Sequence, residues 1–141
     1  GVRFEPAAYR GAAERALESF LGGHKKCTFA LGQMINASPF ELALSLAGYG
    51  FAVTHILATP AEEDFACMKR LAELSPETRV YAPTAPSMMN FAPVADGVGI
   101  AVGKDIAPYF PGAAHVSWNS EMQPFGFQAV ADFFAACEAA L

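Results

Sequence analysis

Residues 27–58, CTFALGQMINASPFELALSLAGYGFAVTHILA, carry a short apolar run at each end and a helical pattern between the two runs. Apolar runs of this length are typical of buried β-strands. Ser38, Pro39 and Glu41 form a helix start, because serine caps, proline suits the first helical position and glutamate completes a capping box. Gly50 ends the helix. The stretch therefore predicts two parallel strands joined by a helix.

The same alternation of apolar runs and helical patterns continues outward to both ends of the chain. It predicts an α/β fold with a parallel sheet and helices on its faces. The strands are expected at 27–31, 51–58, 79–82, 98–102 and 114–118, and the helices at 8–21, from the Ser38 cap to Gly50, from a Thr59 cap to about residue 74, and at 125–141. The proline-rich stretch 83–93 is expected to form no more than one helical turn.

Length and composition indicate one domain, and the charge argues against nucleic acid and anionic membranes as partners. A chain of 141 residues buries enough surface to fold without a disulfide or a metal. Hydrophobic residues make up 53% and charged residues 16%, which leaves two interpretations open: a surface covered by other domains, or simply a large core. The net charge of −5, with no basic stripe, argues against nucleic acid and anionic membranes. No apolar run is long enough for a membrane span.

The cysteines and the first residue bear on the cellular setting. Cys27, Cys67 and Cys137 are odd in number and far apart, so they predict small apolar side chains in a reducing cytoplasm rather than a disulfide framework. The chain opens at Gly1 without a methionine. We therefore expect a single Rossmann-like domain over residues 1–141 that belongs to a larger multi-domain chain.

The sequence contains no complete motif for phosphate binding. Residues 99–105 are similar to a P-loop, but only three residues separate the glycines, and Asp105 stands where the motif needs serine or threonine. The loop at 32–36 lacks the glycines of a dinucleotide fingerprint. Two interpretations of Lys104 and Asp105 stay open: a solvated pair, or an anion site at the strand end in which the lysine binds the anion.

Neither metal ligands nor a catalytic nucleophile can be assigned from spacing. His24, His55 and His115 share no metal-ligand spacing. His55 alternates with Val53 and Leu57, which favours a hydrogen-bonded core histidine. We predict no catalytic residue and no metal ligand in this chain.

Residues 115–127, HVSWNSEMQPFGF, join the last predicted strand to the last helix. In open α/β sheets this hinge lies at the carboxyl ends of the strands, where ligands bind. Ser117-Trp118, followed by Pro124-Phe125-Gly126-Phe127 opening a helix, resembles the end of the third domain of nitrogenase component 1 type oxidoreductases. That family includes the molybdenum-iron protein subunits, cofactor-assembly scaffold proteins and dark-operative protochlorophyllide reductases. The resemblance extends loosely over residues 24–140.

The resemblance implies a three-layer α/β/α, chelatase-like domain with four to five strands in the central order 2-1-3-4. In the catalytic family members, a cofactor-ligating histidine lies between the aromatic residue and the glycine of the block. Here Phe125 precedes Gly126 directly, so the resemblance implies a cavity wall without metal ligands. The implied cofactor-facing residues are Gly103, Lys104, Trp118, Asn119, Pro124, Phe125 and Gly126.

The resemblance also implies a function. It describes a cofactor- or substrate-facing domain of a nitrogenase-like oxidoreductase or of its metallocluster assembly scaffold, inactive as an isolated domain. An iron–sulfur-type metallocluster is implied for the full-length protein and none for this fragment. The implied partners are other domains of the same chain, a homologous subunit and an electron-donor protein. The alternative is a non-redox α/β module that binds a small anion or serves as an assembly interface.

Overall fold

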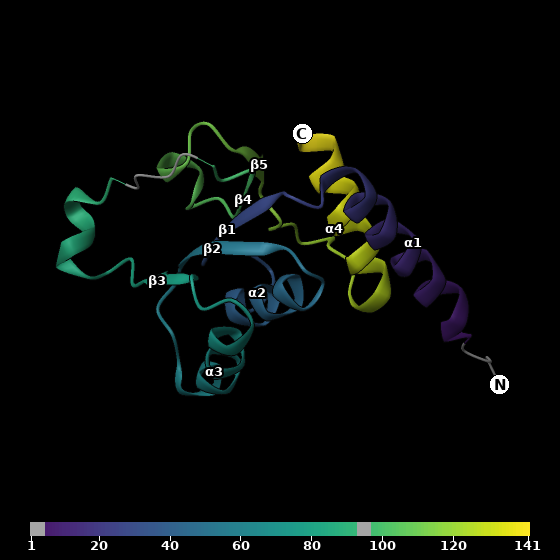
Figure 1. The fold of residues 1–141 in the computed structure, drawn as a ribbon, viewed down its shortest axis with the longest axis horizontal. Helices are drawn as coiled ribbons and strands as arrows, with labels where there is room; N and C mark the ends of the chain where they lie inside the picture. The colour runs from purple at the N-terminus through teal and green to yellow at the C-terminus, as the bar shows by residue number, and fades with distance from the viewer. Residues whose placement is uncertain (1–4, 93–96) are drawn as a thin grey trace.

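The computed structural model describes residues 5–92 and 97–141, and Figure 1 shows their arrangement around one sheet. The predicted α/β, Rossmann-like class is confirmed, because all strand pairs in the sheet are parallel. The strands are β1 (Thr28–Gly32), β2 (Ala52–Leu57), β3 (Arg79–Tyr81), β4 (Ile100–Val102) and β5 (Ala114–Val116). The helices are α1 (Pro6–His24), α2 (Pro39–Gly48), α3 (Phe65–Leu74) and α4 (Gly126–Ala140), with single 3₁₀ turns η1 (Glu62–Asp64), η2 (Pro86–Asn90) and η3 (Ala107–Tyr109).

The strand order is β3-β2-β1-β4-β5, so the expected order 2-1-3-4 is wrong in its placement of the third strand. β3 pairs with the outer edge of β2, and β4 takes the free edge of β1. The physical reason lies in the helices. α2 packs against α3 on one face, and right-handed crossovers on the same face move the chain across the sheet in one direction. A third strand beside β1 would require α3 to cover the opposite face.

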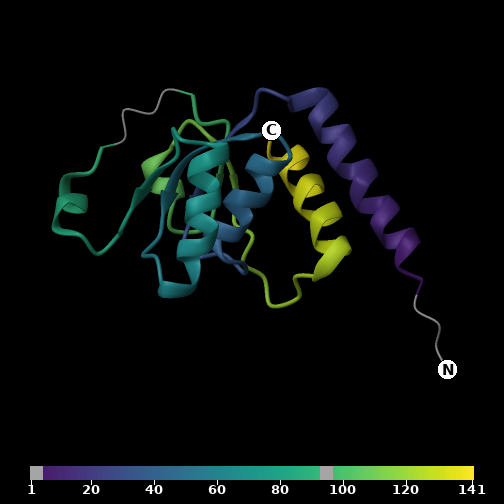
Figure 2. The same cartoon turned by 60° about the horizontal axis from the view of Figure 1, so that its bottom comes forward.

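All four α-helices cover one face of the sheet, where they lie side by side in Figure 2. Every second residue of β1 and β4 points into this layer. The sheet contributes Phe29, Leu31, Val53, Ile56, Ile100, Val102 and Val116 to the core, and the helices contribute Phe20, Phe40, Leu46, Leu71, Phe133 and Phe134. The register of β2 against β1 shifts by one residue at a bulge, because Phe29 pairs with Val53 and Ala30 pairs with His55. This helix-covered face holds the larger of the two cores.

The opposite face of the sheet is covered by 3₁₀ turns and loops. Its core consists of Ala30, Leu57 and Ala101 from the sheet, under Met88, Ile106 and Phe110. The third layer is therefore built from η2, η3 and their flanking loops rather than from α-helices. Proline explains this, because the ring cannot continue a helix interior. The single turn η2 confirms the prediction for the stretch 83–93, whose last residue lies outside the described residues.

One predicted helix start is confirmed and the other is wrong. The Ser38 hydroxyl accepts the Glu41 N–H at 3.3 Å, a cap that contributes about 1 kcal/mol. Thr59 is not at a helix start, because the first turn begins only at Glu62 and α3 at Phe65; its N–H donates to the Gln33 side chain at 3.0 Å. The chain instead enters α3 through η1, whose Asp64 carboxylate accepts a backbone N–H at 2.8 Å.

His55 lies half-buried on the loop-covered face and is hydrogen-bonded, as predicted. Its Nδ1 is 2.9 Å from the Thr54 hydroxyl. That hydroxyl donates its hydrogen to the Phe29 carbonyl at 3.2 Å, so Nδ1 is the donor toward Thr54. The imidazole stacks on Tyr81, with ring centroids 5.8 Å apart. Burial, and secondly the charge of Arg79, lower the pKa of His55.

We predict that this histidine makes the fold less stable in acid. Its pKa is lower in the folded chain than in the unfolded chain, where it is about 6.5. The unfolded chain therefore takes up the proton first, and the contribution of neutral His55 is complete above that value and is lost as the pH falls below it. Urea unfolding at pH values on either side of 6.5 should show that the free energy of unfolding falls more on acidification for the wild type than for His55→Gln. Equal losses would contradict the prediction.

Candidate functional site

The loop after β1, residues 33–37, contacts the loops that follow three other strands. It receives a hydrogen bond from Thr59 after β2 and donates to Asp105 after β4. It also donates to Trp118 and Ser120 after β5. The strand order puts a topological switch point between β1 and β4, and ligands of open α/β sheets bind at such points. The loop therefore stands at the fold's expected binding position.

The carboxylate of Asp105 occupies the switch point. It accepts the N–H of Gln33 at 2.8 Å and the N–H of Met34 at 3.0 Å. A Cβ at Gly103 would lie 2.9 Å from the carboxylate, and one at Gly32 would lie still closer, so both glycines make room for it. Asp105 is therefore not the solvated partner of Lys104, which is exposed. The two N–H groups that this loop would offer a bound anion already have a carboxylate partner.

Trp118 lies in the loop after β5 and joins it by a hydrogen bond to the loop after β1. Its backbone is left-handed, with φ of 42°, the one positive value outside glycine in the described part of the chain. Its carbonyl accepts the Asn36 N–H at 3.0 Å. Its indole and the Phe133 ring form a T-shaped pair, with ring centroids 5.1 Å apart. With the Gln123 amide in the orientation that satisfies both partners, its oxygen accepts the indole N–H at 3.0 Å and its N–H donates to the Trp118 carbonyl at 3.1 Å.

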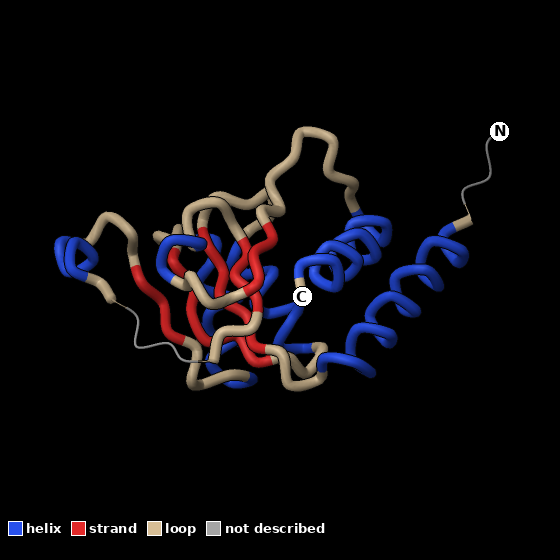
Figure 3. The backbone as a smooth tube through the Cα atoms, turned by 90° about the horizontal axis from the view of Figure 1, so that it is seen from above, coloured by secondary structure: helices blue, strands red, loops and turns tan. Residues whose placement is uncertain are grey.

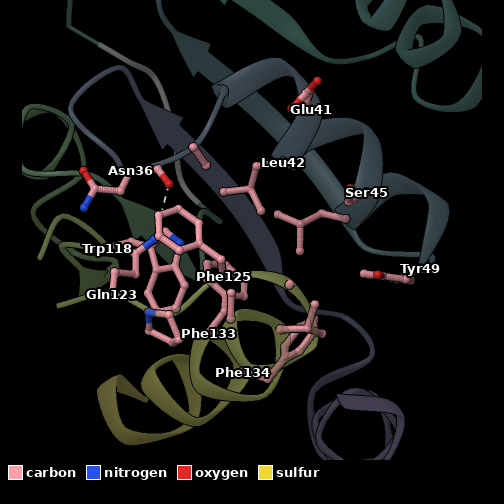
Figure 4. Close-up of a pocket in the computed structure, with 16 residues that line it drawn as sticks. Asn36, Glu41, Leu42, Ser45, Tyr49, Trp118, Gln123, Phe125, Phe133 and Phe134 are labelled. Atoms are coloured by element: carbon pink, nitrogen blue, oxygen red, sulfur yellow. Dashed lines mark hydrogen bonds between the residues drawn. The ribbon is translucent and has the colours of Figure 1, made fainter. Parts of the chain in front are cut away.

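A groove of about 250 Å³ runs between α2 and α4, and we call it the aromatic groove. Figure 4 shows Trp118, Phe125 and Phe133 on one side of it and residues of α2 on the other. Its apolar lining comes mainly from Leu42, Leu46, Tyr49, Trp118, Phe125, Val130, Phe133 and Phe134, and its polar lining from Asn36, Glu41, Ser45 and Gln123. Phe125 lines the groove and is also 87% exposed.

The structure brings four of the seven predicted wall residues together. Trp118, Pro124, Phe125 and Gly126 line the aromatic groove. The loop that carries them arches away from the sheet between β5 and α4 in Figure 3. Asn119 lines the neighbouring hollow and donates to the Met34 carbonyl at 3.2 Å.

The remaining two predicted wall residues, Gly103 and Lys104, lie at the end of β4 and do not line the groove. The carbonyl of Gly103 accepts a hydrogen bond from the His115 ring at 2.7 Å, and its N–H donates to the Val116 carbonyl at 2.9 Å. Gly103 also has φ of 119°, a backbone conformation that favours glycine. The observed contacts of Gly103 are structural.

The wall contributed by α2 is absent from the prediction. Glu41, Ser45 and Tyr49 are four residues apart, so they follow one another along one side of the helix, and all three line the groove. This spacing is visible in the sequence. What the sequence does not contain is the neighbour of that helix side, because α2 and α4 are separated by most of the chain.

The donor set of the groove does not fit a metallocluster as a ligand shell. No thiol or imidazole lines the groove. Across residues 5–92 and 97–141, no group of three His, Cys, Asp or Glu side chains could hold a metal ion. The three cysteines are free thiols, and burial raises the pKa of Cys27 and of Cys137. The groove can therefore present an apolar surface to a cofactor but no ligating atom of the kind that clusters use.

In the part of the chain that the structure describes, no helix combines the length and apolar character needed to cross a bilayer.

No family model, curated protein or solved structure matches this chain. The resemblance to nitrogenase component 1 type oxidoreductases thus stays a prediction.

Proposed function

We propose that this domain supplies an apolar wall to a cofactor- or substrate-holding cavity, within a nitrogenase-like oxidoreductase or its metallocluster assembly scaffold. The observation that carries the proposal is the aromatic groove, which ends in a solvent-exposed phenylalanine. Phe125 is 87% exposed and Met122, three residues earlier, is 91% exposed. Large apolar side chains gathered at one exposed place are typical of surfaces that another molecule covers. The other walls then come from other domains of the same chain or from a homologous subunit.

The chemistry of the groove supports a wall rather than a catalytic centre. Its polar side chains are two amides, one hydroxyl and one carboxylate at different points of the rim, besides the Tyr49 phenol. None of them forms an acid–base pair with another by a hydrogen bond in the described residues. A cluster held by ligands elsewhere would supply the redox chemistry, while this chain would exclude water and orient the bound group. The proposal places the protein in a reducing cytoplasm, in keeping with its free thiols.

We predict that Phe125→Ala reduces cofactor retention without affecting folding. The full polypeptide that carries this sequence would be purified anaerobically, and its iron and acid-labile sulfide would be measured per chain. Loss of an exposed aromatic anchor at a covered surface is expected to weaken the contact by about tenfold. Thermal unfolding should be unchanged, because the ring is 87% exposed.

Met89→Ala is the matched control for this experiment. Met89 is 86% exposed, and it lies on η2 at the opposite side of the molecule from α4 in Figure 1. Its replacement should leave the iron content unchanged. A colourless protein without iron or sulfide would overturn the proposed function, and equal losses in the two variants would show that the groove is not responsible.

A second candidate, an assembly interface without a redox role, is favoured by the same exposed side chains. Phe125, Met122 and Phe127, which is 42% exposed, lie at the start of α4. Light scattering would separate the candidates, because an interface predicts a metal-free oligomer that Phe125→Ala dissociates. The small-anion form of this alternative has weaker support, since Asp105 already accepts the loop N–H groups at the switch point. Thermal shift with phosphate tests that form directly.

A further inference from the structure

Asp105 lies outside the aromatic groove but is joined to it through the loop after β1. Its carboxylate binds the N–H groups of Gln33 and Met34, at 2.8 and 3.0 Å. The Met34 carbonyl in turn accepts the Asn119 side chain at 3.2 Å. Asn119 directly follows Trp118, which forms the groove wall. A short run of hydrogen bonds thus connects the end of β4 to the groove.

A second run of hydrogen bonds ends at the same wall. Asn36 donates its N–H to the Trp118 carbonyl at 3.0 Å and its side-chain amide to the Ser120 carbonyl at 2.7 Å. The loop therefore holds the chain on both sides of Asn119. Trp118 needs this support, because its left-handed φ of 42° is disfavoured for every residue except glycine and, to a lesser degree, asparagine and aspartate.

The conformation of the loop depends on hydrogen bonds more than on packing. Gln33, Met34 and Asn36 are exposed, and only Ile35 of these four loop residues is buried. Segments with few buried apolar contacts open easily unless polar bonds hold them. The bonds to Asp105 are of the stronger kind, since the acceptor is a carboxylate. The absence of side chains at Gly32 and Gly103 creates the space that this carboxylate fills.

We propose that Asp105 is a positioning residue for the aromatic groove. By holding the loop of residues 33–36 at the end of β1, it sets the backbone and the indole of Trp118. This inference rests on the proposed function for its biological meaning, but the coupling itself is a property of the chain. Asp105 takes the position that the fold offers to a ligand's anion and uses it to shape the neighbouring groove.

The experiment follows the fluorescence of Trp118, which reports on the groove wall directly because it is the chain's only tryptophan. Asp105→Asn keeps the shape of the side chain but replaces one acceptor oxygen by a donor, so it cannot accept both N–H groups in the same way. We expect the Trp118 emission to move to longer wavelength and acrylamide quenching to increase. Hydrogen exchange at the Gln33 and Met34 amides should accelerate by about tenfold. Glu73→Gln, an exposed charge removal on α3, is the control and should change none of these readouts.

A double-mutant cycle separates positioning from general stability. Asn119→Ala removes one of the two connections on the groove side, the bond to the Met34 carbonyl, and leaves Asp105 bound to the loop. If the two residues act through one loop, the Asp105→Asn/Asn119→Ala protein should show a smaller change in quenching than the sum of the single changes. Additive changes, or an unchanged Trp118 emission together with a lower urea midpoint, would overturn the proposal and leave Asp105 a merely structural residue.

The test also covers a variant that fails to fold and a protein that holds no cofactor. If Asp105→Asn fails to fold, Asn119→Ala alone decides, and an unchanged Trp118 emission in that variant overturns the inference. None of these readouts depends on a cofactor. A metal-free protein would therefore remove the proposed function and leave this test intact.

Discussion

Replacing Phe29 by alanine is expected to lower the free energy of unfolding by about 4 kcal/mol. Phe29 is fully buried in β1, at the centre of the helix-covered core. Its ring lies 5.4 Å from that of Phe51, 6.3 Å from that of Phe133 and 6.5 Å from that of Phe20, measured between centroids. Three elements, β1, α1 and α4, and the connection before β2 meet at this side chain, so the cavity cannot close by the movement of one of them. Domains of this size are stable by only about 5–15 kcal/mol.

Urea unfolding followed by circular dichroism measures this loss, and the same substitution at Phe125 is its control. Phe125 is 87% exposed, so its truncation should stay within about 0.5 kcal/mol of the wild type. The comparison holds the chemistry of the change constant and varies only burial. Similar stabilities for the two variants would show that Phe29 is not at the centre of the core.

Replacing Gly32 by alanine is expected to cost about 3 kcal/mol. A Cβ at this position would overlap the Asp105 carboxylate, which has little freedom because it is a short side chain held by two backbone N–H groups. Relief of the overlap must break those bonds. The variant should therefore be less stable and should also show the emission change expected for Asp105→Asn.

A second substitution tests the mechanism of this loss. In Gly32→Ala/Asp105→Ala the overlapping carboxylate is absent, so the double variant should be more stable than the sum of the single losses predicts, by about 1–2 kcal/mol. Gly22→Ala is the control, because a Cβ there meets no atom within 4 Å. Strict additivity would mean that Gly32 is required for a reason other than the carboxylate.

Local signals were sufficient for most elements of the fold. Alternation of apolar runs with helix starts predicted all five strands and four helices, because burial and capping act within a few residues. The error at Thr59 shows the limit. Its local pattern repeats that of Ser38, but Gln33 from the loop after β1 takes up its N–H at 3.0 Å, and the helix begins later.

The candidate site was predictable on one side only. The stretch from Trp118 to Gly126 stands out by composition, and most of its predicted wall residues line the aromatic groove. Gly103 and Lys104 belong to the end of a different strand and lie away from it. The sequence left Asp105 as half of a solvated pair or as part of an anion site with Lys104, because nothing local indicates that its carboxylate binds a loop about 70 residues earlier in the chain.

The sequence by itself determined the periodic elements, the class of fold and the aromatic character of one groove wall, since these follow from side-chain volume, backbone preference and spacing along the chain. Only the tertiary structure decided the place of β3, the pairing of α2 with α4 as the two sides of the groove, and the role of Asp105. These depend on contacts between segments far apart in the chain. Crossover handedness and the packing of whole helix faces select such contacts, and no local pattern encodes either of them.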